Sequence, residues 1–567
     1  MSSETNGTAE RFAIGISFGN SSSSIARLNA EGKAEVIANE EGDRQIPSVL
    51  SYIDGEEYHG TQAKAQLIRN SKNTVAYFRD YLGKDFKSID PTPCHNSAHP
   101  QQSDSTVAFS INDTTAETPN TVTVSEITTR HLRRLKQSAS DFLGKQVTAA
   151  VITVPTDFKD AQREALIASA NAAGLEVLQL IHEPVAAVLA YDARPEAVVT
   201  DKLVVVADLG GTRSDAAVVA CRGGMYTILA TAHDYELGGA TLDKIVIDHF
   251  AKEFMKKHKT DPRENARGLA KLKLEGEATR KALSLGTNAT LSIESLADGI
   301  DYGSTVNRTR YELLSGKVFA QFTGLIDQVV KKAGLDVLDI DEVIFAGGTS
   351  HTPKIAQLAR NIFPETTKIL APSTFVGAIN PSELAPRGAA IQASLIQEFE
   401  KEDIEQSIHP MVTATPHLQN AIGVEFTSGE TVDFKSLLNA ETALPARRLA
   451  QFPAPKEGGD VFIRVCEGVR EIKVTKPEPK PKEEKPAKDD DEDDSDFDSD
   501  EDEEEEETRE IVWKTEKPIA ELAVKGVKAG SKVELMIHVN ADLGLQITAK
   551  EVGGQSAVRG AVEAPKA

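Results

Sequence analysis

The sequence predicts an α/β protein in which a two-lobed α/β domain is followed by a smaller all-β, sandwich-like domain. Between residues 12 and 400, strand-like runs alternate with helix-like runs. Two strand–turn–strand patterns recur in this region, which suggests two halves. After residue 400 the chain changes to short apolar runs separated by turn residues, which is typical of an all-β module. At 567 residues, the chain is also too long for a single hydrophobic core.

The first strand–turn–strand pattern is "IGISFGNSSSSIA", residues 14–26. Ile14 and Ile16 alternate with small residues, as in a half-buried strand, and Gly19-Asn20 marks a tight hairpin turn. Backbone N–H groups and hydroxyls in such a turn can donate to a phosphate. The strand ends with Ser17, where a metal-dependent phosphate enzyme would need a carboxylate. This combination predicts a protein that binds a nucleotide without being built to cleave it.

The second pattern is "KLVVVADLGGTRSDAAVVAC", residues 202–221, and it repeats the strand, glycine turn and strand of the first. Before it, residues 147–158 predict a strand that ends at Pro155, with a helix cap at Thr156 or Asp157. Residues 157–174 predict a helix that Gly174 stops, and residues 175–181 predict a buried strand. Each half therefore supplies one phosphate turn, and we expect a nucleotide cleft between two lobes.

The all-β region is predicted to hold short strands within residues 412–426, 430–439, 460–474, 521–527 and 532–552. Residues 475–510 interrupt it with a Pro/Lys/Glu segment and an acidic run, which cannot bury enough apolar surface to fold. We predict a disordered loop that is either a solvated spacer or an electrostatic element near a basic surface.

The composition is 40% apolar and 26% charged, which predicts a soluble globular protein without a membrane-spanning run or a secretory signal. The net charge is −24, and most of it comes from the acidic run at residues 489–507. We therefore expect no direct DNA binding and no membrane partner. Cys94, Cys221 and Cys466 form no disulfide framework and lack metal-ligand spacing, which favours a reducing compartment such as the cytosol.

Several strings, in a common order over most of residues 12–400, resemble the heat shock protein 70 (DnaK-type) chaperones. They are "VITVPTDFKDAQREALIASANAAGLEVLQLIHEPVAAVLAY", "VVADLGG", "ELGGATLDKIVIDHF", "SIESLADGIDY", "FAGGTSHTPKI" and "APRGAAIQAS". The string "VELMIHVNADLGLQITAKEVGG" is similar to the last strands of that family's substrate-binding β-domain. The resemblance implies an actin-like two-lobed ATPase domain followed by a β-sandwich domain, here expected without the family's helical lid.

The departures from the family pattern resemble its atypical, ribosome-associated branch in fungi. They are Ser17, an altered second phosphate turn, the missing lid and the run "VIANEEGDRQIPSVLSY". This resemblance implies a stable heterodimer with zuotin, a J-domain protein, in the ribosome-associated complex. It also implies a cytoplasmic location on ribosomes and a second, active heat shock protein 70 family chaperone as a further partner.

The resemblance implies a disordered N-terminus at 1–11, an actin-like nucleotide-binding domain at 12–399 and an interdomain linker at 400–411. It further implies a β-sandwich domain at 412–556, with its disordered acidic insertion at 475–510, and a C-terminal tail at 557–567. The linker has only Ile404 and Ile408 as spaced apolar residues, where the family has a run of leucines flanked by aspartates. We therefore expect no ATP-driven coupling, and a β-domain that acts as a static docking surface for an extended partner segment.

In the first phosphate turn, the family's aspartate and threonines match Ser17, Asn20 and Ser21. Ser17 cannot offer a negative oxygen to a hard cation, so the resemblance implies ATP as the ligand, with Mg²⁺ weakly held or absent.

In the second turn, "DLGGTRSD", Thr212 replaces the family's third glycine and Arg213 replaces its threonine near the γ-phosphate. Arg213 either clamps a phosphate or points into solvent. In both cases, a hydroxyl that helps to position water or phosphate is lost.

Lys64 matches the family's catalytic lysine, and Glu183 matches its glutamate near the metal-bound water. Because one positioned acid–base group contributes about 10²–10⁴ in rate, weak metal binding and an altered turn would make a slow ATPase negligible. We expect no catalytic residue.

The nucleoside side is the best preserved. The family's adenosine side chains match Glu277, Arg280, Lys281 and Ser284, whose spacing places them on one helix face. His351 stands where the family has an arginine that stacks on adenine. The residues expected to bind nucleotide are Gly19, Asn20, Ser21, Lys64, Glu183, Asp208, Gly210, Gly211, Thr212, Gly238, Gly239, Glu277, Arg280, Lys281, Ser284, Gly347, Gly348, Thr349, His351 and Asn380, with Asp208 as the metal ligand.

The pattern favours a non-cycling, ATP-binding partner protein that acts as a co-chaperone for nascent polypeptides. An active, ATP-hydrolysing peptide-binding chaperone is the alternative, with Glu183 and Lys64 sufficient for turnover. A small-molecule kinase on the same two-lobed fold is disfavoured, because the β-domain is not expected in one and no base for a hydroxyl substrate stands out.

Overall fold

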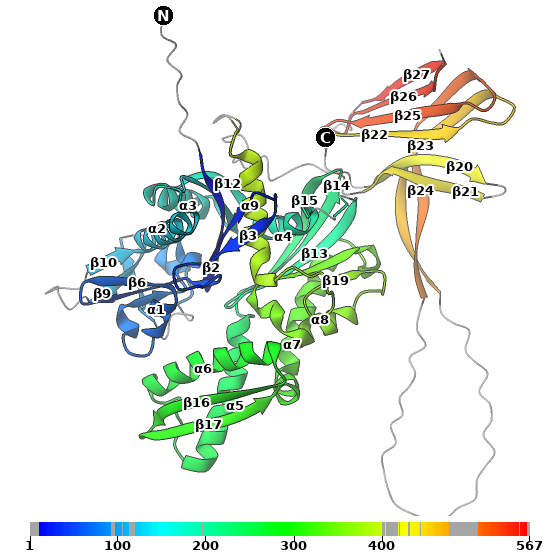
Figure 1. The fold of residues 1–567 in the computed structure, drawn as a ribbon. Helices are drawn as coiled ribbons and strands as arrows, with labels where there is room; N and C mark the ends of the chain where they lie inside the picture. Colours follow the sequence, from blue (N-terminus) through cyan, green and yellow to red (C-terminus); the bar gives the residue numbers. More distant parts are fainter. Residues whose placement is uncertain are drawn as a thin grey trace, which may run out of the picture. The chain divides into compact units, whose positions relative to one another are not determined.

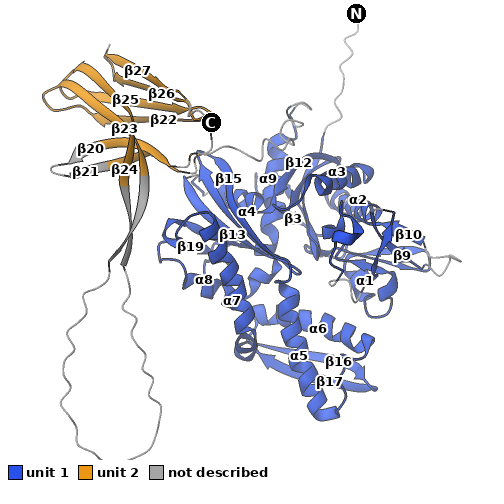
Figure 2. Cartoon of the chain, turned by 180° about the vertical axis from the view of Figure 1, so that it is seen from behind, with its two compact units in different colours: residues 1–415 blue, residues 416–567 orange. Residues whose placement is uncertain are grey.

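The computed structural model describes residues 11–91, 97–104, 106–112, 120–194, 197–198, 200–399, 403, 418, 420–428, 431–440, 442, 444–475, 508–554 and 556–563. The chain divides into two compact units, residues 1–415 and residues 416–567 (Figure 2). Most of the predicted linker, the predicted acidic insertion and Cys94 lie outside the described residues. The confirmed fold class is a two-lobed α/β domain followed by a β-sandwich domain.

The first lobe of unit 1 is built on a sheet with the strand order β12-β11-β1-β2-β3, and β4 also pairs with β2 (Figure 1). The β1–β2 hairpin is antiparallel, and β1 pairs in parallel with β11. Its strands are β1 (Ala13–Phe18), β2 (Ser22–Leu28), β3 (Ala34–Ile37), β4 (Ile46–Pro47), β11 (Ala149–Val154) and β12 (Glu176–His182).

Two small sheets and three helices complete this lobe; the sheets and the two longer helices share its core, whereas the shortest helix packs in a smaller apolar cluster. The small sheets have the orders β6-β5-β7 and β10-β9-β8. The elements are β5 (Val49–Ile53), β6 (Glu56–His59), α1 (Gly60–Ala65), β7 (Thr74–Ala76), β8 (Pro100–Ser103), β9 (Thr106–Ile111), β10 (Asn120–Thr123), α2 (Val124–Leu143) and α3 (Asp160–Ala172). Helix α2 is capped by Thr123, whose hydroxyl accepts from the Glu126 amide, and ends at Gly144 with φ 62°.

The second lobe has a sheet with the order β15-β14-β13-β18-β19 and a separate β16–β17 hairpin. The strands are β13 (Lys202–Leu209), β14 (Ser214–Arg222), β15 (Met225–Asp234), β16 (Asn288–Ala297), β17 (Ile300–Asn307), β18 (Glu342–Ala346) and β19 (Lys368–Leu370). The helices are α5 (Gly239–His258), α6 (Ala266–Leu285), α7 (Arg308–Lys332) and α8 (Pro353–Arg360). One hydrophobic core joins these elements.

Helices α4 (Glu183–Asp192) and α9 (Leu384–Ile396) connect the two lobes. Apolar residues of α4 pack both against β13 and β18 of the second lobe and against α9 and β11. The contact between the two helices depends on glycine, because a Cβ at Gly388 would lie 1.9 Å from the Ala186 carbonyl oxygen. A Cβ at Gly15 of β1 would lie 2.2 Å from the Ala390 nitrogen of α9. This close packing fixes the strand end that carries the first phosphate turn.

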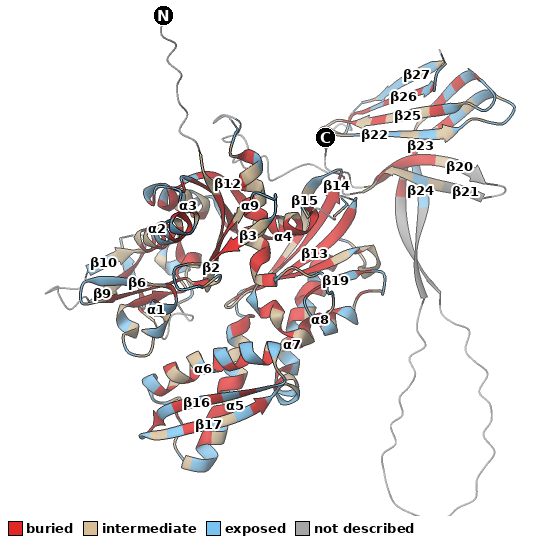
Figure 3. Ribbon diagram, in the orientation of Figure 1, coloured by how far each residue is buried: buried red, intermediate tan, exposed pale blue. Residues whose placement is uncertain are grey.

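The described residues of unit 2 form two four-stranded sheets, with the orders β21-β20-β23-β24 and β22-β25-β26-β27. One apolar cluster joins residues of both sheets, as in a β-sandwich. The strands are β20 (Ala421–Ser428), β21 (Thr431–Leu438), β22 (Ala446–Pro453), β23 (Gly459–Thr475), β24 (Thr508–Val527), β25 (Lys532–Val539), β26 (Leu545–Glu551) and β27 (Ala557–Val562). Buried residues follow the strands of both units in Figure 3.

The structure differs from the sequence-based expectation at several element boundaries. The predicted tail at 557–567 contains β27, because Ala557–Val562 pairs along β26 from Lys550 to Leu545. Strand β22 was not predicted, since it contains two arginines, of which Arg447 is exposed, and it ends in a proline. The long β23 and β24 pair as far as Thr475 opposite Thr508, inside both ends of the predicted insertion. Helix α3 is capped at Lys159, two residues after the predicted Asp157.

Among the described residues, no helix combines the length and apolarity needed to cross a bilayer.

Candidate functional site

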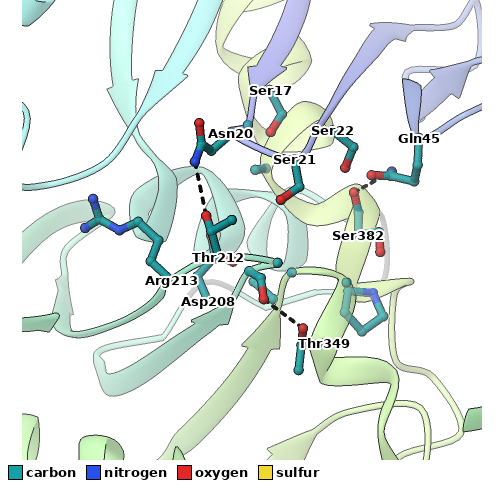
Figure 4. Close-up of a pocket in the computed structure, with 18 of the residues that line it drawn as sticks. Ser17, Asn20, Ser21, Ser22, Gln45, Asp208, Thr212, Arg213, Thr349 and Ser382 are labelled. Carbon is teal, nitrogen blue, oxygen red and sulfur yellow. Dashed lines mark hydrogen bonds between the residues drawn. The ribbon is translucent and has the colours of Figure 1, made fainter. Parts of the chain in front are cut away.

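A cavity of about 180 Å³ lies between the two lobes of unit 1, where the ends of β1 and β13 meet (Figure 4). Both predicted phosphate turns contribute to its wall. The residues predicted to bind nucleotide that line it are Gly19, Asn20, Ser21, Glu183, Asp208, Gly210, Gly211, Thr212, Glu277, Arg280, Lys281, Gly347, Gly348 and Thr349. Those that do not line it are Lys64, Gly238, Gly239, Ser284, His351 and Asn380.

The two turns touch each other at the cavity. The Asn20 side-chain amide donates to the Thr212 hydroxyl at 3.1 Å, and a Cβ at Gly211 would lie only 2.4 Å from Ser21 Oγ. The other atom of the Asn20 side-chain amide, the oxygen Oδ1, is buried and has no hydrogen-bond partner. If the amide turned over, it would keep its bond to the Thr212 hydroxyl and present its NH₂ group to a ligand oxygen. A glycine at 211 and an asparagine at 20 therefore suit a phosphate that bridges the turns.

Glycines also open the far wall of the cavity. Gly347 has φ 81°, in the left-handed region, and lies against the Leu209 carbonyl and Asp208. A Cβ at Gly348 would meet nothing closer than Ser382 Oγ at 3.8 Å, so a ligand can approach the backbone there. Thr349 Oγ1 donates to the Gly210 carbonyl at 2.7 Å, which ties this wall to the second phosphate turn (Figure 4).

The base of the cavity concentrates buried carboxylates. Burial raises the pKa of Glu183 above its ordinary value, although Arg79 at 3.3 Å opposes this and Asp208 adds to it. Burial, and then the charge of Asp215, raises the pKa of Asp208 as well. The cation beside Glu183 is Arg79, whereas Lys64 lies elsewhere.

Arg213 neither reaches into the cavity centre nor points into solvent. Its side chain is 8% exposed, and its guanidinium pairs with Asp215 and lies 3.0 Å from Asp157. It also stacks over the Tyr235 ring, 4.6 Å from the centroid, and His233 Nδ1 lies 2.6 Å from Asp215. Figure 4 shows the guanidinium turned away from Ser21 and Thr349. The solvent-exposed alternative raised from the sequence is therefore wrong, because the guanidinium forms a buried ion pair, and the phosphate-clamp alternative stays a prediction.

On the nucleoside side, α6 presents Glu277 to Lys64 of the other lobe at 2.7 Å. Burial would raise the pKa of Glu277, but the charges of Lys64 and Lys281 outweigh burial and lower it to about 2. Arg280 is 5% exposed and pairs with Asp243. These ion pairs keep the wall charged, and the Lys64–Glu277 pair joins the two lobes beside the cavity.

The remaining predicted residues support the wall from behind. His351 Nε2 lies 3.2 Å from Ser382 Oγ, and the Asn380 side chain accepts from the Ser382 amide at 3.0 Å. Ser382 itself lines the cavity, and its carbonyl accepts from Gln45 at 2.8 Å. A Cβ at Gly238 would lie 2.7 Å from the Gly211 carbonyl oxygen, so Gly238 allows the second turn to pack closely.

Several lining residues were not in the predicted set: Ser17, Ser22, Gln45, Arg79, Arg213, Asp215, Ala346, Pro381, Ser382 and Ala385. Arg79 is the most consequential, because it is 5% exposed and pairs with both Glu183 and Asp80. Nothing in its own neighbourhood in the sequence marks it, since Glu183 is distant along the chain.

The donor set fits a nucleotide better than a tightly held metal ion. Within the described part of the chain, the Asp208 carboxylate has no hydrogen-bond partner and remains available to a cation. Asp215 is already engaged by Arg213 and His233, and Ser17 offers only a hydroxyl. Mg²⁺ is commonly held by one or two carboxylates together with phosphate oxygens and water. Asp208 could thus hold Mg²⁺ only with help from the nucleotide.

The described residues bring Asp157, Asp215 and His233 close enough together to suggest a metal site. The Arg213 guanidinium lies among them and bonds to both carboxylates. The arginine supplies the positive charge there, so we assign no metal to this cluster.

Comparison with known proteins agrees with the motifs. A family model described as Hsp70 protein matches residues 13–476. The chain is 45% identical over 547 residues to the ribosome-associated complex subunit SSZ1 of Saccharomyces cerevisiae, covering 96% of this chain and 99% of that protein. It is 45% identical over 553 residues to the heat shock protein 70 homolog C57A7.12 of Schizosaccharomyces pombe, covering 96% and 95%. Human heat shock 70 kDa protein 14 is 33% identical over 459 residues, covering 80% and 87%.

Proposed function

The chain belongs to the Hsp70 family, and on this premise we propose that it is an atypical member that binds ATP but hydrolyses it negligibly. The observation that carries the proposal is the position of Arg213, which replaces a hydroxyl of the second phosphate turn and is committed to Asp215 and Asp157. The glycine-lined wall and the contact between the two turns remain suited to ATP. Asp208 would hold Mg²⁺ weakly, because Ser17 contributes no charge.

We further propose that the protein forms a stable heterodimer with a zuotin-like J-domain protein on cytoplasmic ribosomes. The pair would help a second, active Hsp70-family chaperone to receive nascent polypeptides. Support comes from the SSZ1 relative, which is named a subunit of the ribosome-associated complex and aligns over almost its whole length. The β-sandwich unit would offer the partner a docking surface. No role is assigned to the acidic insertion, most of which lies outside the described residues.

A single-turnover assay tests the first proposal. Purified chain is mixed with a substoichiometric amount of radiolabelled ATP and Mg²⁺, and both bound nucleotide and released phosphate are followed. We expect ATP to be recovered intact from the protein, with or without an added J-domain. Turnover that a J-domain stimulates would contradict the proposal, and absence of bound nucleotide would contradict the binding site itself.

The alternative, an active chaperone, is favoured by one feature: a buried cation, Arg79, lies 3.3 Å from Glu183 at the base of the cavity. Such a pair could position a nucleophilic water. Arg79→Met distinguishes the readings, because it would abolish turnover in an active ATPase. If the proposed function is right, the wild-type protein has no turnover, so Arg79→Met cannot reduce it. A folded Arg79→Met protein would still pull down a J-domain partner from cytosol.

A further inference from the structure

A second, much smaller cavity lies within the first lobe, and none of its lining residues lines the nucleotide cavity. It is bounded by the first turn of α1, the middle of α2 and the residues before β4. Its volume is about 10 Å³, which is close to the space that one buried water needs. Two histidines, His59 and His131, contribute to its wall.

The tautomer of His131 follows from a chain of hydrogen bonds. Ser48 Oγ donates to the Gly19 carbonyl at 2.7 Å, and this uses its only hydrogen. In the 3.0 Å contact between the two hydroxyls, Ser23 must therefore be the donor to Ser48. Ser23 Oγ is then the acceptor for His131 Nε2 at 2.9 Å. His131 carries its proton on Nε2, and its Nδ1 is a bare lone pair.

The environment of His131 keeps the ring neutral. Its side chain is 1% exposed and lies between Phe18 and Phe78, with ring centroids 5.9 and 5.8 Å away. Burial, reinforced by the neighbouring His59, lowers the pKa of His131 to about 3. The Nδ1 atom is buried and has no hydrogen-bond partner.

His59 also lines this cavity, and it too has a buried ring nitrogen without a partner. Its Nε2 lies 2.8 Å from Glu57 Oε1, and a carboxylate can only accept, so Nε2 donates. Burial would raise the pKa of Glu57, but its bonds from His59 and Arg130 lower it to about 2, so the carboxylate is ionised. His59 Nδ1 is buried and also lacks a partner. In neutral His59, this atom is a second bare lone pair.

Two buried lone pairs in one cavity need a ligand with two hydrogens to give. We propose that a single structural water occupies this cavity and donates one hydrogen to His59 Nδ1 and the other to His131 Nδ1. A water of this kind typically makes about three hydrogen bonds, and Asn39, Ser138 and Glu41 offer further polar atoms on the wall. The water would complete a chain from Glu57, on β6, to the carbonyl of Gly19 in the first phosphate turn.

A metal ion fits this cavity less well than a water does. Zinc requires four ligands, usually including several His or Cys, whereas the wall of this cavity holds two His, one Glu and no Cys. Among the described residues, the one cluster of His and carboxylate groups with metal-like spacing is Asp157, Asp215 and His233, none of which lines this cavity. The volume also matches a single small molecule rather than a hydrated ion.

Crystallography of the full chain at high resolution tests the site directly. We expect one spherical density peak about 2.7–3.2 Å from both Nδ1 atoms. A peak at about 2.0–2.1 Å with anomalous signal would identify a metal and overturn the proposal. An empty cavity, or a direct bond between either Nδ1 atom and the protein, would overturn it as well.

A double-mutant cycle tests the shared ligand in solution. The urea midpoints of His59→Phe, His131→Phe and the double variant are compared with that of the wild-type protein. If His59→Phe does not fold, His59→Gln is used in its place. Each substitution also removes the histidine's own Nε2 bond, to Glu57 or to Ser23, but both release the same water, so we expect the midpoint loss of the double variant to be smaller than the sum of the two single losses. The control pairs His131→Phe with His258→Phe, in α5 of the other lobe, and should be additive. Additive losses for His59 and His131 would overturn the shared water.

Discussion

The guanidinium of Arg213 lies 3.0 Å from the carboxylate of Asp157, and this contact ties the two lobes of the nucleotide domain together at the base of the cleft. Asp157 follows β11 of the first lobe, whereas Arg213 lies in the turn between β13 and β14 of the second. Tyr235 strengthens the tie, because its hydroxyl donates to Asp157 at 2.8 Å beneath the stacked guanidinium. A residue that departs from the family pattern thus has a structural role between the lobes.

We predict that Arg213→Met lowers the free energy of unfolding of unit 1 by about 3 kcal/mol, because it leaves Asp215 and Asp157 without their buried partner. The described helices all lie in unit 1, so urea unfolding followed by helical circular dichroism reports on that unit.

Arg263→Met is the matched control for this variant. Arg263 also pairs with two carboxylates, Asp248 and Asp261, but its side chain is 30% exposed. Its loss should cost less than about 1 kcal/mol, because water screens exposed ion pairs. Equal losses for the two arginines would show that the Arg213 contacts do not stabilise the lobes.

The sequence was most informative where function depends on residues that are close together in the chain. The two turns were predicted from local strand and glycine patterns, and the structure places Asn20 and Thr212 3.1 Å apart between them. Arg79 was missed because its partner, Glu183, belongs to a different segment, and only the folded lobe brings them together. The role of Arg213 was left open for the same reason, since Asp157 lies in the other lobe.

The β-domain shows a second limit of sequence reasoning. Strand β22 has alternating exposed and half-buried residues but no run of large apolar side chains, so its pairing with β25 decides its structure. Strand β27 likewise depends on β26, to which it pairs from Ala557 to Val562. Edge strands of this kind carry little local signal, because tertiary pairing supplies most of their stability.

Lys64→Met is predicted to speed the release of a fluorescent ATP analogue roughly five-fold, since a half-exposed ion pair contributes up to about 1 kcal/mol. The reason is that Lys64, on α1, and Glu277, on α6, form an ion pair of 2.7 Å that joins the two lobes beside the cleft. The measurement is stopped-flow displacement of the analogue by excess ATP. Lys331→Met, which removes an exposed pair within α7, serves as control and should leave the rate unchanged. A normal release rate for Lys64→Met would rule out a contribution of this pair to nucleotide retention.

The pH dependence of stability should carry the signature of Glu183. Burial raises its pKa above the ordinary 4.5, so the folded protein retains a proton that the unfolded chain has released. The unfolded state therefore binds fewer protons above pH 4.5, and stability falls as pH rises through this window. Glu183→Gln removes this contribution. We expect the urea midpoint of the wild-type protein to fall more steeply between pH 5 and pH 8 than that of the variant, and parallel curves would refute a raised pKa.

Ser17→Asp tests whether the missing carboxylate explains the weak metal site. Ser17 is the last residue but one of β1 and shares the cavity wall with Asp208, so a carboxylate there would give Mg²⁺ a second charged ligand. In EDTA, the added charge should weaken ATP binding roughly five-fold, because one more like charge near the phosphates costs about 1 kcal/mol. Mg²⁺ should restore the affinity, as measured by isothermal titration calorimetry. The control is Ser17→Asn, because asparagine has the size of aspartate but no charge. Its ATP affinity should change little, either in EDTA or in Mg²⁺. If the Asp and Asn variants behaved alike, the charge at position 17 would not control metal binding, and the engagement of Asp215 by Arg213 would be the dominant cause.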